Sequence, residues 1–226
     1  MIRLEGLTKI YHTRGLRKLV ADSITIDFPS GIGIGLLGRN GAGKSTLLKM
    51  IAGTVDPTAG KIVHDGTVSW PVGFGGSFHP DLTGLQNVRF VARVYGVDTT
   101  SLCRFVEDFA ELGDHFYLPT RNYSSGMKAR LSFGVSMGIR FDTYLVDETT
   151  NVGDAVFREK SEAIFQERIG NSSAIMVSHG AAMLRRNCTS GAVLEHGKLY
   201  WFDEIDEAIA FHESNMGAAT LEDDDA

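Results

Sequence analysis

One glycine-rich stretch stands out in this sequence: Gly38-Arg39-Asn40-Gly41-Ala42-Gly43-Lys44-Ser45-Thr46. It matches the pattern G-x-x-x-x-G-K-[ST] without a mismatch, and in that pattern the backbone N–H groups surround phosphate. Apolar residues 32–37 lead into the stretch, and residues 45–52 after it have the apolar spacing of a helix. We therefore predict a buried strand, a phosphate-binding loop and a helix whose dipole places positive charge at the loop.

The side chains of this loop have separate predicted roles. Lys44 reaches the β- and γ-phosphates of a nucleoside triphosphate, and the Ser45 hydroxyl ligates Mg²⁺. Thr46 adds a hydrogen bond to phosphate. The predicted phosphate-binding set is Gly38, Asn40, Gly41, Ala42, Gly43, Lys44, Ser45 and Thr46.

An acidic pair follows a second apolar segment, residues 143–146. At the end of a strand, Asp147 can hold a water on Mg²⁺, and Glu148 can polarise a water for attack on the γ-phosphate. Taken alone, such a pair is more often a solvated strand end. Downstream of a phosphate loop, however, the catalytic interpretation is favoured.

The rest of the chain alternates apolar segments with helical patterns. We expect strands at 2–7, 23–28, 61–63, 68–70 and 174–177, a hairpin at 192–202, a helix at 155–169 and a helical pattern at 85–138. This alternation predicts an α/β core with a parallel sheet. We expect one domain over 1–218 with a helical insertion at about 85–138. The core is expected to end near Phe211, and 219–226 to form an acidic C-terminal tail.

Composition narrows the classes of function. The chain has 226 residues, 43% of them hydrophobic and 22% charged, which is the range of ordinary globular domains. Its net charge of -6 argues against nucleic acid as a partner. Cys103 and Cys188 are too few for a disulfide scaffold, so a reducing cytosol is expected. No apolar run approaches the roughly 20 residues that cross a bilayer.

Two further motifs complete an ordered series. Tyr123-Ser124-Ser125-Gly126-Met127 precedes a helical run, and Ser178-His179 follows the apolar strand at 174–177. A phosphate loop, a signature motif, an acidic strand and a switch histidine in this order resemble the ABC ATPase family across essentially the whole chain. The resemblance implies a P-loop NTPase core with a parallel sheet, an N-terminal antiparallel β part and an inserted helical subdomain.

The resemblance also implies roles for matching residues. ATP is the substrate, and Tyr11 stacks on its adenine. Glu148, His179 and Lys44 are the catalytic residues, and Ser45 and Asp147 hold Mg²⁺, the latter through water. Ser124, Ser125 and Gly126 contact the ATP that a second copy of the chain binds. The loop with Asn151, Gly153 and Asp154 crosses the dimer interface.

Three departures from the family pattern stand out. Most ABC ATPases place a glutamine where this chain has a glycine-rich segment around Phe74, and Ser77 or His79 could substitute for it through a water. Met127 replaces the usual glutamine of the signature, and Thr149 replaces the usual proline. None of these changes removes a phosphate ligand or the catalytic base, so we expect hydrolysis to survive.

Five segments taken together resemble the ATPase subunit of bacterial capsular-polysaccharide exporters: Ser69-Trp70-Pro71-Val72-Gly73, the glycine-rich loop without glutamine, Leu82-Thr83-Gly84, Tyr123-Ser124-Ser125-Gly126-Met127 and Val152-Gly153-Asp154. That resemblance implies a peripheral subunit on the cytoplasmic face of the bacterial inner membrane. Its partners would be a second copy of itself, a polytopic permease and, through the permease, periplasmic export components. The alternatives are an ATPase of another exporter or of an importer, a soluble ABC ATPase not tied to a membrane, and a nucleotide-binding regulator without hydrolysis.

Overall fold

The structure of the chain is a computed structural model that describes residues 1–13, 15–72, 78–147, 154–178 and 180–222. For residues 13 and 217–222 it gives the course of the backbone alone. The chain divides into two compact units. The sheet unit comprises Met1–Pro71, Phe141–Glu148 and Asn171–Ala226, and the helical unit comprises Val72–Arg140 and Thr149–Gly170.

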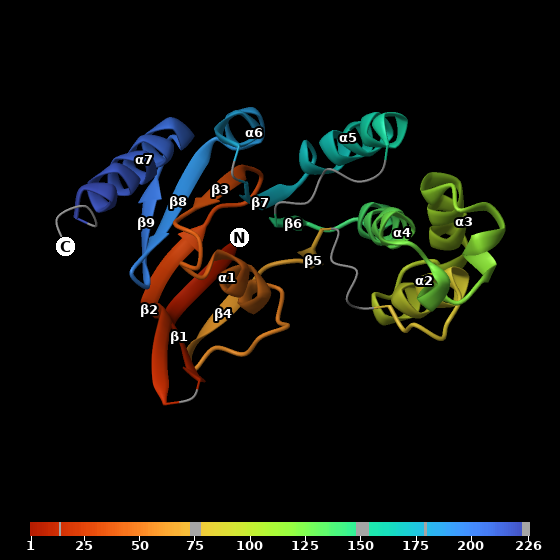
Figure 1. Ribbon diagram of the computed structural model, residues 1–226, viewed down its shortest axis with the longest axis horizontal. Coiled ribbons are helices and arrows are strands. Elements are labelled where there is room, and N and C mark those ends of the chain that lie inside the picture. The colour runs from red at the N-terminus through yellow and green to blue at the C-terminus, as the bar shows by residue number, and fades with distance from the viewer. Residues whose placement is uncertain (14, 73–77, 148–153, 179, 223–226) are drawn as a thin grey trace. The chain divides into compact units, whose positions relative to one another are not determined.

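The sheet unit contains an antiparallel sheet in the strand order β2-β1-β4 (Figure 1). Its strands are β1 (Ile2–Thr13), β2 (Leu16–Phe28) and β4 (Ala59–His64). The predicted strands at 2–7 and 23–28 are present but are parts of a longer hairpin. Residues 8–12 and 16–19 are half-buried or exposed, so they lack the apolar alternation from which a strand is predicted.

A second, six-stranded sheet has the order β5-β6-β7-β3-β8-β9. Its strands are β3 (Gly33–Leu37), β5 (Val68–Pro71), β6 (Thr143–Asp147), β7 (Ser173–Val177), β8 (Ser190–Glu195) and β9 (Lys198–Phe202). Every pairing from β5 through β8 is parallel, and β9 pairs with β8 antiparallel. The predicted α/β fold with a parallel sheet is therefore confirmed.

Three helices belong to the sheet unit. Helix α1 (Lys44–Ile51) packs against β5, β6 and β7, while α6 (Ala181–Asn187) and α7 (Ile205–Glu222) pack against β3. Helix α7 also runs along β8 and β9 (Figure 1). Neither α6 nor α7 was predicted. The backbone of α7 is helical beyond the expected end of the core at Phe211, and the expected tail boundary at 219 falls inside this helix.

One apolar cluster joins both sheets to α1. The antiparallel sheet contributes Leu4 and Leu7, β3 contributes Leu36, and α1 contributes Leu47 and Leu48, all nearly inaccessible to solvent. Residues on either side of the phosphate loop belong to this cluster. Both ends of the loop are therefore held in place by buried apolar side chains. Among the described residues, no helix has both the length and the apolarity needed to span a bilayer.

The helical unit contains α2 (Gly84–Val94), α3 (Thr99–Ala110), α4 (Ser125–Gly138) and α5 (Ala155–Ile169). Its core is aromatic: the Phe109 ring lies 5.9 Å from that of Phe133 and 5.2 Å from that of Phe157. Gly134 permits this close packing, since a Cβ there would lie 3.2 Å from the Phe109 ring. The unit includes α5, which lies outside the predicted insertion at about 85–138. The single domain over 1–218 remains a prediction.

Each unit holds one buried cysteine. Cys103 lies on α3 of the helical unit, and Cys188 follows α6 in the sheet unit. Burial raises the pKa of the Cys103 thiol above its ordinary value. Burial raises the pKa of the Cys188 thiol further, to about 12. Both thiols are therefore protonated at neutral pH.

Candidate nucleotide-binding site

The glycine-rich loop connects β3 to α1 and is shaped by contacts that only glycine allows. At Gly43, the residue before α1, φ is 109°, and a Cβ would lie 2.2 Å from Cγ1 of Val20 on β2. At Gly38, a Cβ would lie 2.4 Å from the carbonyl oxygen of Leu194 on β8. Any larger residue would push the loop away from both strands. The loop is thus pressed against neighbouring strands at its beginning and at its end.

Lys44 curls back over the loop from the first turn of α1. Its Nζ donates hydrogen bonds of 2.6 Å to the carbonyl oxygen of Gly38 and 3.2 Å to that of Arg39. These bonds hold the ammonium within the loop. Phosphate oxygens are charged acceptors and form stronger bonds with an ammonium than carbonyl oxygens do, so this position suits a phosphate-binding lysine.

A cavity of about 290 Å³, called the front cavity below, lies between the loop and strands β1 and β2. The predicted residues that line it are Tyr11, Asn40, Gly41, Gly43, Lys44, Ser45 and Thr46. Gly38 instead lines the second cavity described below. Lys18 and Val20 also line the front cavity, and neither belongs to a motif that the sequence indicates. Extending the hairpin beyond residues 7 and 23 would have found Lys18, because it then pairs with Tyr11.

Tyr11 lies on β1 at the mouth of this cavity, with 39% of its surface exposed. The Lys9 ammonium lies 4.9 Å from the centroid of the Tyr11 ring, and it donates a 2.6 Å hydrogen bond to the carbonyl oxygen of Asp56. Tyr11 thus combines a partly exposed aromatic surface with a fixed cation over its ring. Such a ring is suited to stacking with a base.

The acidic strand ends at the same edge of the sheet as the glycine-rich loop. β3, β6 and β7 run parallel, and Asp147 at the end of β6 pairs with Val177 at the end of β7. Ser178 follows β7 and lines a cavity together with Lys44. Ligands of open parallel sheets bind at this carboxyl edge. Glu148 and His179 lie outside the described residues, so their predicted positions stay predictions.

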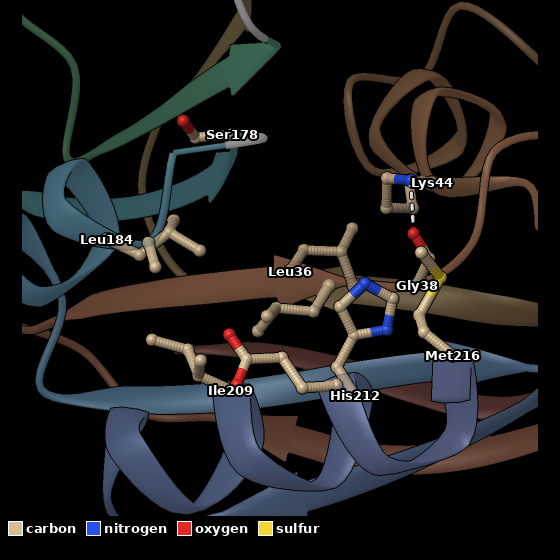
Figure 2. A pocket seen from close by; sticks show the side chains of 11 residues that line it. Leu36, Gly38, Lys44, Ser178, Leu184, Ile209, His212 and Met216 are labelled. Carbon is tan, nitrogen blue, oxygen red and sulfur yellow. Dashed lines mark hydrogen bonds between the residues drawn. The ribbon is translucent and has the colours of Figure 1, made fainter. Parts of the chain in front are cut away.

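This second cavity, of about 300 Å³, lies between the loop, α6 and α7 (Figure 2). Figure 2 shows Ile209, His212 and Met216 of α7 along one wall, with Lys44 and Ser178 across from them. Burial lowers the pKa of His212, and the positive charge of Lys44 lowers it further. His212 is therefore neutral at physiological pH, and it adds no positive charge next to Lys44.

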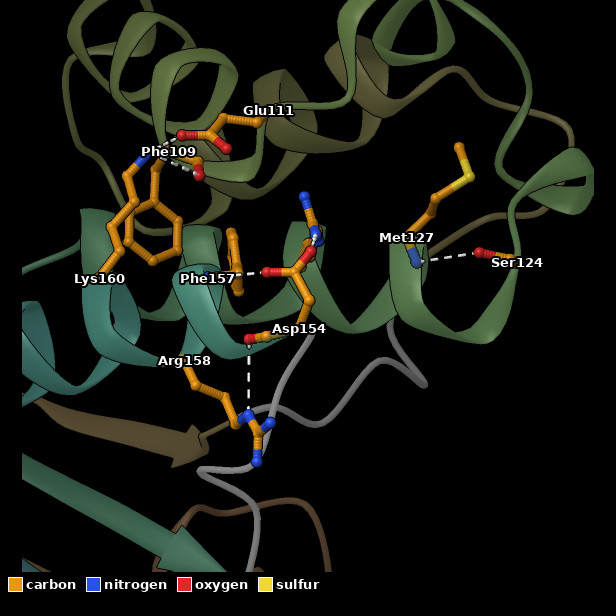
Figure 3. A network of polar contacts seen from close by, with 9 residues as sticks. Phe109, Glu111, Ser124, Met127, Asp154, Phe157, Arg158 and Lys160 are labelled. Carbon is orange, nitrogen blue, oxygen red and sulfur yellow. Dashed lines mark hydrogen bonds and ion pairs between the residues drawn. The ribbon is translucent and has the colours of Figure 1, made fainter.

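The signature residues lie at the start of α4 in the helical unit (Figure 3). Ser124 caps the helix: its hydroxyl accepts a 3.2 Å hydrogen bond from the backbone N–H of Met127. Ser124, Ser125 and Gly126 are all exposed. An exposed helix N-terminus with hydroxyl groups is a suitable surface for an anion.

Asp154 connects the start of α5 to α4 (Figure 3). One of its carboxylate oxygens accepts a 3.0 Å bond from the Phe157 N–H, and the other accepts a 2.8 Å bond from Arg130. The Phe157 bond and the Arg130 charge lower the pKa of Asp154. The Arg130 guanidinium also lies 4.5 Å from the Phe157 ring centroid. Asp154 is thus anchored, while Asn151 and Gly153 lie outside the described residues.

The segment that lacks the expected glutamine is described only from residue 78, so Phe74 and Ser77 lie outside the described residues. His79 is exposed, and its Nδ1 accepts a 3.3 Å hydrogen bond from the Asp81 N–H. The nearby Gln86 is committed to a capping box with Thr83, with bonds of 2.9 and 3.1 Å. Gln86 therefore serves the start of α2.

Asn87 organises the same segment, although nothing in the sequence pattern indicated it. It is 2% exposed, and its Oδ1 accepts a 2.8 Å bond from the His79 N–H. Its Nδ2 lies within hydrogen-bond distance of the carbonyl oxygens of His79, Leu82 and Thr83, at 3.2, 3.2 and 3.0 Å. No sequence motif marks such a residue, because its partners are backbone groups.

Comparison with known proteins gives consistent matches. Residues 21–151 match a family model described as ABC transporter. The polysialic acid transport ATP-binding protein KpsT of Escherichia coli is 48% identical over 206 residues, covering 90% of this chain and 92% of that protein. The capsule polysaccharide export ATP-binding protein CtrD of Neisseria meningitidis serogroup B is 42% identical over 214 residues, covering 95% and 99%.

A solved structure also matches the fold. It is described as the dimeric structure of a post-hydrolysis state of the ATP-binding cassette MJ0796 bound to ADP and Pi. Its TM-score is 0.73 at 18% sequence identity, covering 91% of this chain and 99% of that chain. At this identity the likeness concerns the fold alone.

Proposed function

Because the chain belongs to the ABC transporter family of ATP-hydrolysing, ATP-binding proteins, we propose that it powers export of a capsular or related cell-surface polysaccharide. The observation that carries this proposal is the identity of 48% and 42% with KpsT and CtrD, over 90% and 95% of the chain. These relatives are described as transporting polysialic acid and exporting capsule polysaccharide. The membership predicted from the motifs is confirmed by the family match.

In this proposal ATP occupies the front cavity. The adenine stacks on Tyr11, and the backbone N–H groups from Gly38 to Thr46 surround the phosphates. Lys44 exchanges its bonds to the Gly38 and Arg39 carbonyl oxygens for bonds to the β- and γ-phosphates. The support for this arrangement is that one cavity is lined by both the aromatic ring and the loop.

Hydrolysis is assigned to the carboxyl edge of the six-stranded sheet. Glu148 accepts a proton from the attacking water, and His179 orients the γ-phosphate. A serine hydroxyl and one carboxylate, Ser45 and Asp147, fit the sparse all-oxygen donor set that Mg²⁺ takes beside phosphates. When bound, Mg²⁺ would neutralise charge on the phosphates.

Two copies of the chain would form two ATP sites. Each copy supplies Ser124, Ser125 and Gly126 to the ATP held by the other, and the segment with Asn151, Gly153 and Asp154 lies at their interface. The exposure of all three signature residues at a helix N-terminus supports this role. The γ-phosphate then joins the two copies until hydrolysis removes it.

The force of dimer closure would pass to a separate polytopic permease, with periplasmic export components beyond it. The helical unit exposes apolar side chains on α2, with Phe90 58% and Val94 62% exposed. A permease segment could dock on such residues. In this proposal the chain acts on the cytoplasmic face of the inner membrane. The similarity to exporter ATPases over nearly the whole chain disfavours an importer and a membrane-independent ABC ATPase.

The proposal is tested in cells that lack this chain and make its polysaccharide. The wild-type chain should restore polysaccharide to the cell surface, whereas Lys44→Ala should leave the polymer inside the cell. Lys49→Ala removes a lysine from the same helix outside the loop, and it should restore export. Normal surface polysaccharide with Lys44→Ala, or without any copy of the chain, would show that its ATP hydrolysis does not power export.

A further inference from the structure

Lys18 shares a face of the antiparallel sheet with Tyr11. The two residues are direct partners in the pairing of β1 with β2, and directly opposed residues of antiparallel strands project from the same face. The preceding pair, His12 and Arg17, projects from the other face. The hairpin therefore directs Lys18 toward the aromatic ring and Arg17 away from it.

The Lys18 ammonium lies close to the phosphate loop. Lys18 lines the front cavity with Tyr11 and the loop residues. Its Nζ is 3.8 Å from the position that a Cβ on Gly41 would occupy, so it reaches the loop backbone itself. A long side chain from the hairpin thus spans the distance between the aromatic end of the cavity and the loop.

Within the described part of the chain, Lys18 forms no ion pair or hydrogen bond. Lys9 and Lys44 differ in this respect, because both donate to backbone carbonyl oxygens. An ammonium held near a ring of backbone N–H groups adds to a positive region. The ligand that such a region favours is an anion.

We propose that Lys18 is a nucleotide-binding residue whose ammonium contacts the α- and β-phosphates of ATP. This inference rests on the proposed function of the front cavity. Lys44 faces the β- and γ-phosphates from the helix side of the loop, whereas Lys18 is tied by its strand register to Tyr11, which takes the adenine. The phosphates between the ribose and the loop are therefore the ones within its reach.

A contact of Lys18 with the α- and β-phosphates predicts how the affinities for ADP and ATP change when Lys18 is replaced. ADP and ATP share the α- and β-phosphates, so loss of Lys18 weakens both to a similar degree. A charge-assisted contact at an exposed site predicts a loss of roughly fivefold to twentyfold in affinity at low salt. Because exposed charges are screened, the loss should shrink when the salt rises from about 0.05 M to about 0.5 M.

The experiment measures ADP and ATP affinity of the full chain by calorimetry, for the wild type, Lys18→Met, Lys18→Arg and Arg17→Met. Lys18→Met should lose affinity as stated, and Lys18→Arg should retain most of it. Arg17→Met removes the same charge from the other face and should stay within about twofold of the wild type. Matching thermal unfolding curves confirm that the variants are folded.

The measured affinities distinguish failure of the Lys18 contact from failure of the proposed function of the front cavity. Equal affinities for Lys18→Met and Arg17→Met would overturn the Lys18 contact, because only the general charge of the hairpin would then matter. A loss confined to ATP would also overturn it, since that result places Lys18 at the γ-phosphate. A wild-type chain that binds neither ADP nor ATP would instead overturn the proposed function of the cavity.

Discussion

Two hydrogen bonds hold the Lys44 side chain within the loop. Its bonds to the carbonyl oxygens of Gly38 and Arg39 fix a flexible side chain, so part of the entropy cost of ordering it is met on folding. The tight contacts of Gly43 and Gly38 with neighbouring strands hold the backbone in the same way. Binding at this site therefore requires little rearrangement of the loop.

Glu148→Gln tests the assignment of the catalytic base. Glutamine keeps the size of the side chain but cannot accept the proton of the attacking water, so ATP binding should persist while turnover falls roughly a hundredfold or more. With hydrolysis blocked, ATP should hold two copies together, as a dimer in size-exclusion chromatography with multi-angle light scattering. Turnover at the wild-type rate in this variant would place the base elsewhere in the chain.

Residues in one contiguous motif could be assigned from the sequence, whereas residues brought together by pairing could not. The loop from Gly38 to Thr46 carries its geometry in its own glycines. Lys18 and Val20 reach the same cavity through the register of β1 with β2. The sequence of residues 16–21, Leu-Arg-Lys-Leu-Val-Ala, does not alternate between apolar and polar residues, so no such pattern predicted the strand that positions them.

At the scale of elements, Asn87 fixes the segment that precedes α2. It is buried and bonds to backbone groups of three residues. Asn87→Ala would leave several of these groups without partners, so we expect a loss of about 3 kcal/mol in the unfolding free energy of the helical unit. Urea denaturation, monitored by hydrogen exchange of the backbone amides of α2, measures this loss.

Asn122→Ala is the matched control for this element. Asn122 is exposed and belongs to the same unit, so its replacement should change stability by less than about 0.5 kcal/mol. Equal losses for the two variants would mean that the bonds of Asn87 do not stabilise the segment.

Helix α7 shows why some elements could not be predicted. Its apolar anchors, Ile205, Ala208 and Ile209, are buried but cover only its first turns. Further along the helix, Glu213 and Met216 are exposed, so the apolar spacing ends before the helix does. The length of α7 was therefore not visible in the pattern, and neither was the cavity wall formed by His212.

At the scale of the whole molecule, the chain combines two units with different cores. The sheet unit is held by aliphatic residues of two sheets and α1, and it contains the phosphate loop. The helical unit is held by an aromatic cluster around Phe109, and it carries the signature residues. Sequence periodicity predicted both kinds of structure but not the boundary between them, because α5 joins the helical unit from a distant part of the chain.

The single buried cysteine in each unit provides a built-in reporter of local opening. A protonated, buried thiol resists alkylation until its surroundings unfold, so pulsed labelling with iodoacetamide and mass spectrometry would time the opening of each unit separately. ADP at about 100 times its dissociation constant should slow labelling of Cys188 by up to about a hundredfold if opening abolishes binding. Cys103, in the unit without the phosphate loop, should be protected far less. Equal protection of both cysteines would instead mean that the two units open together as one cooperative block.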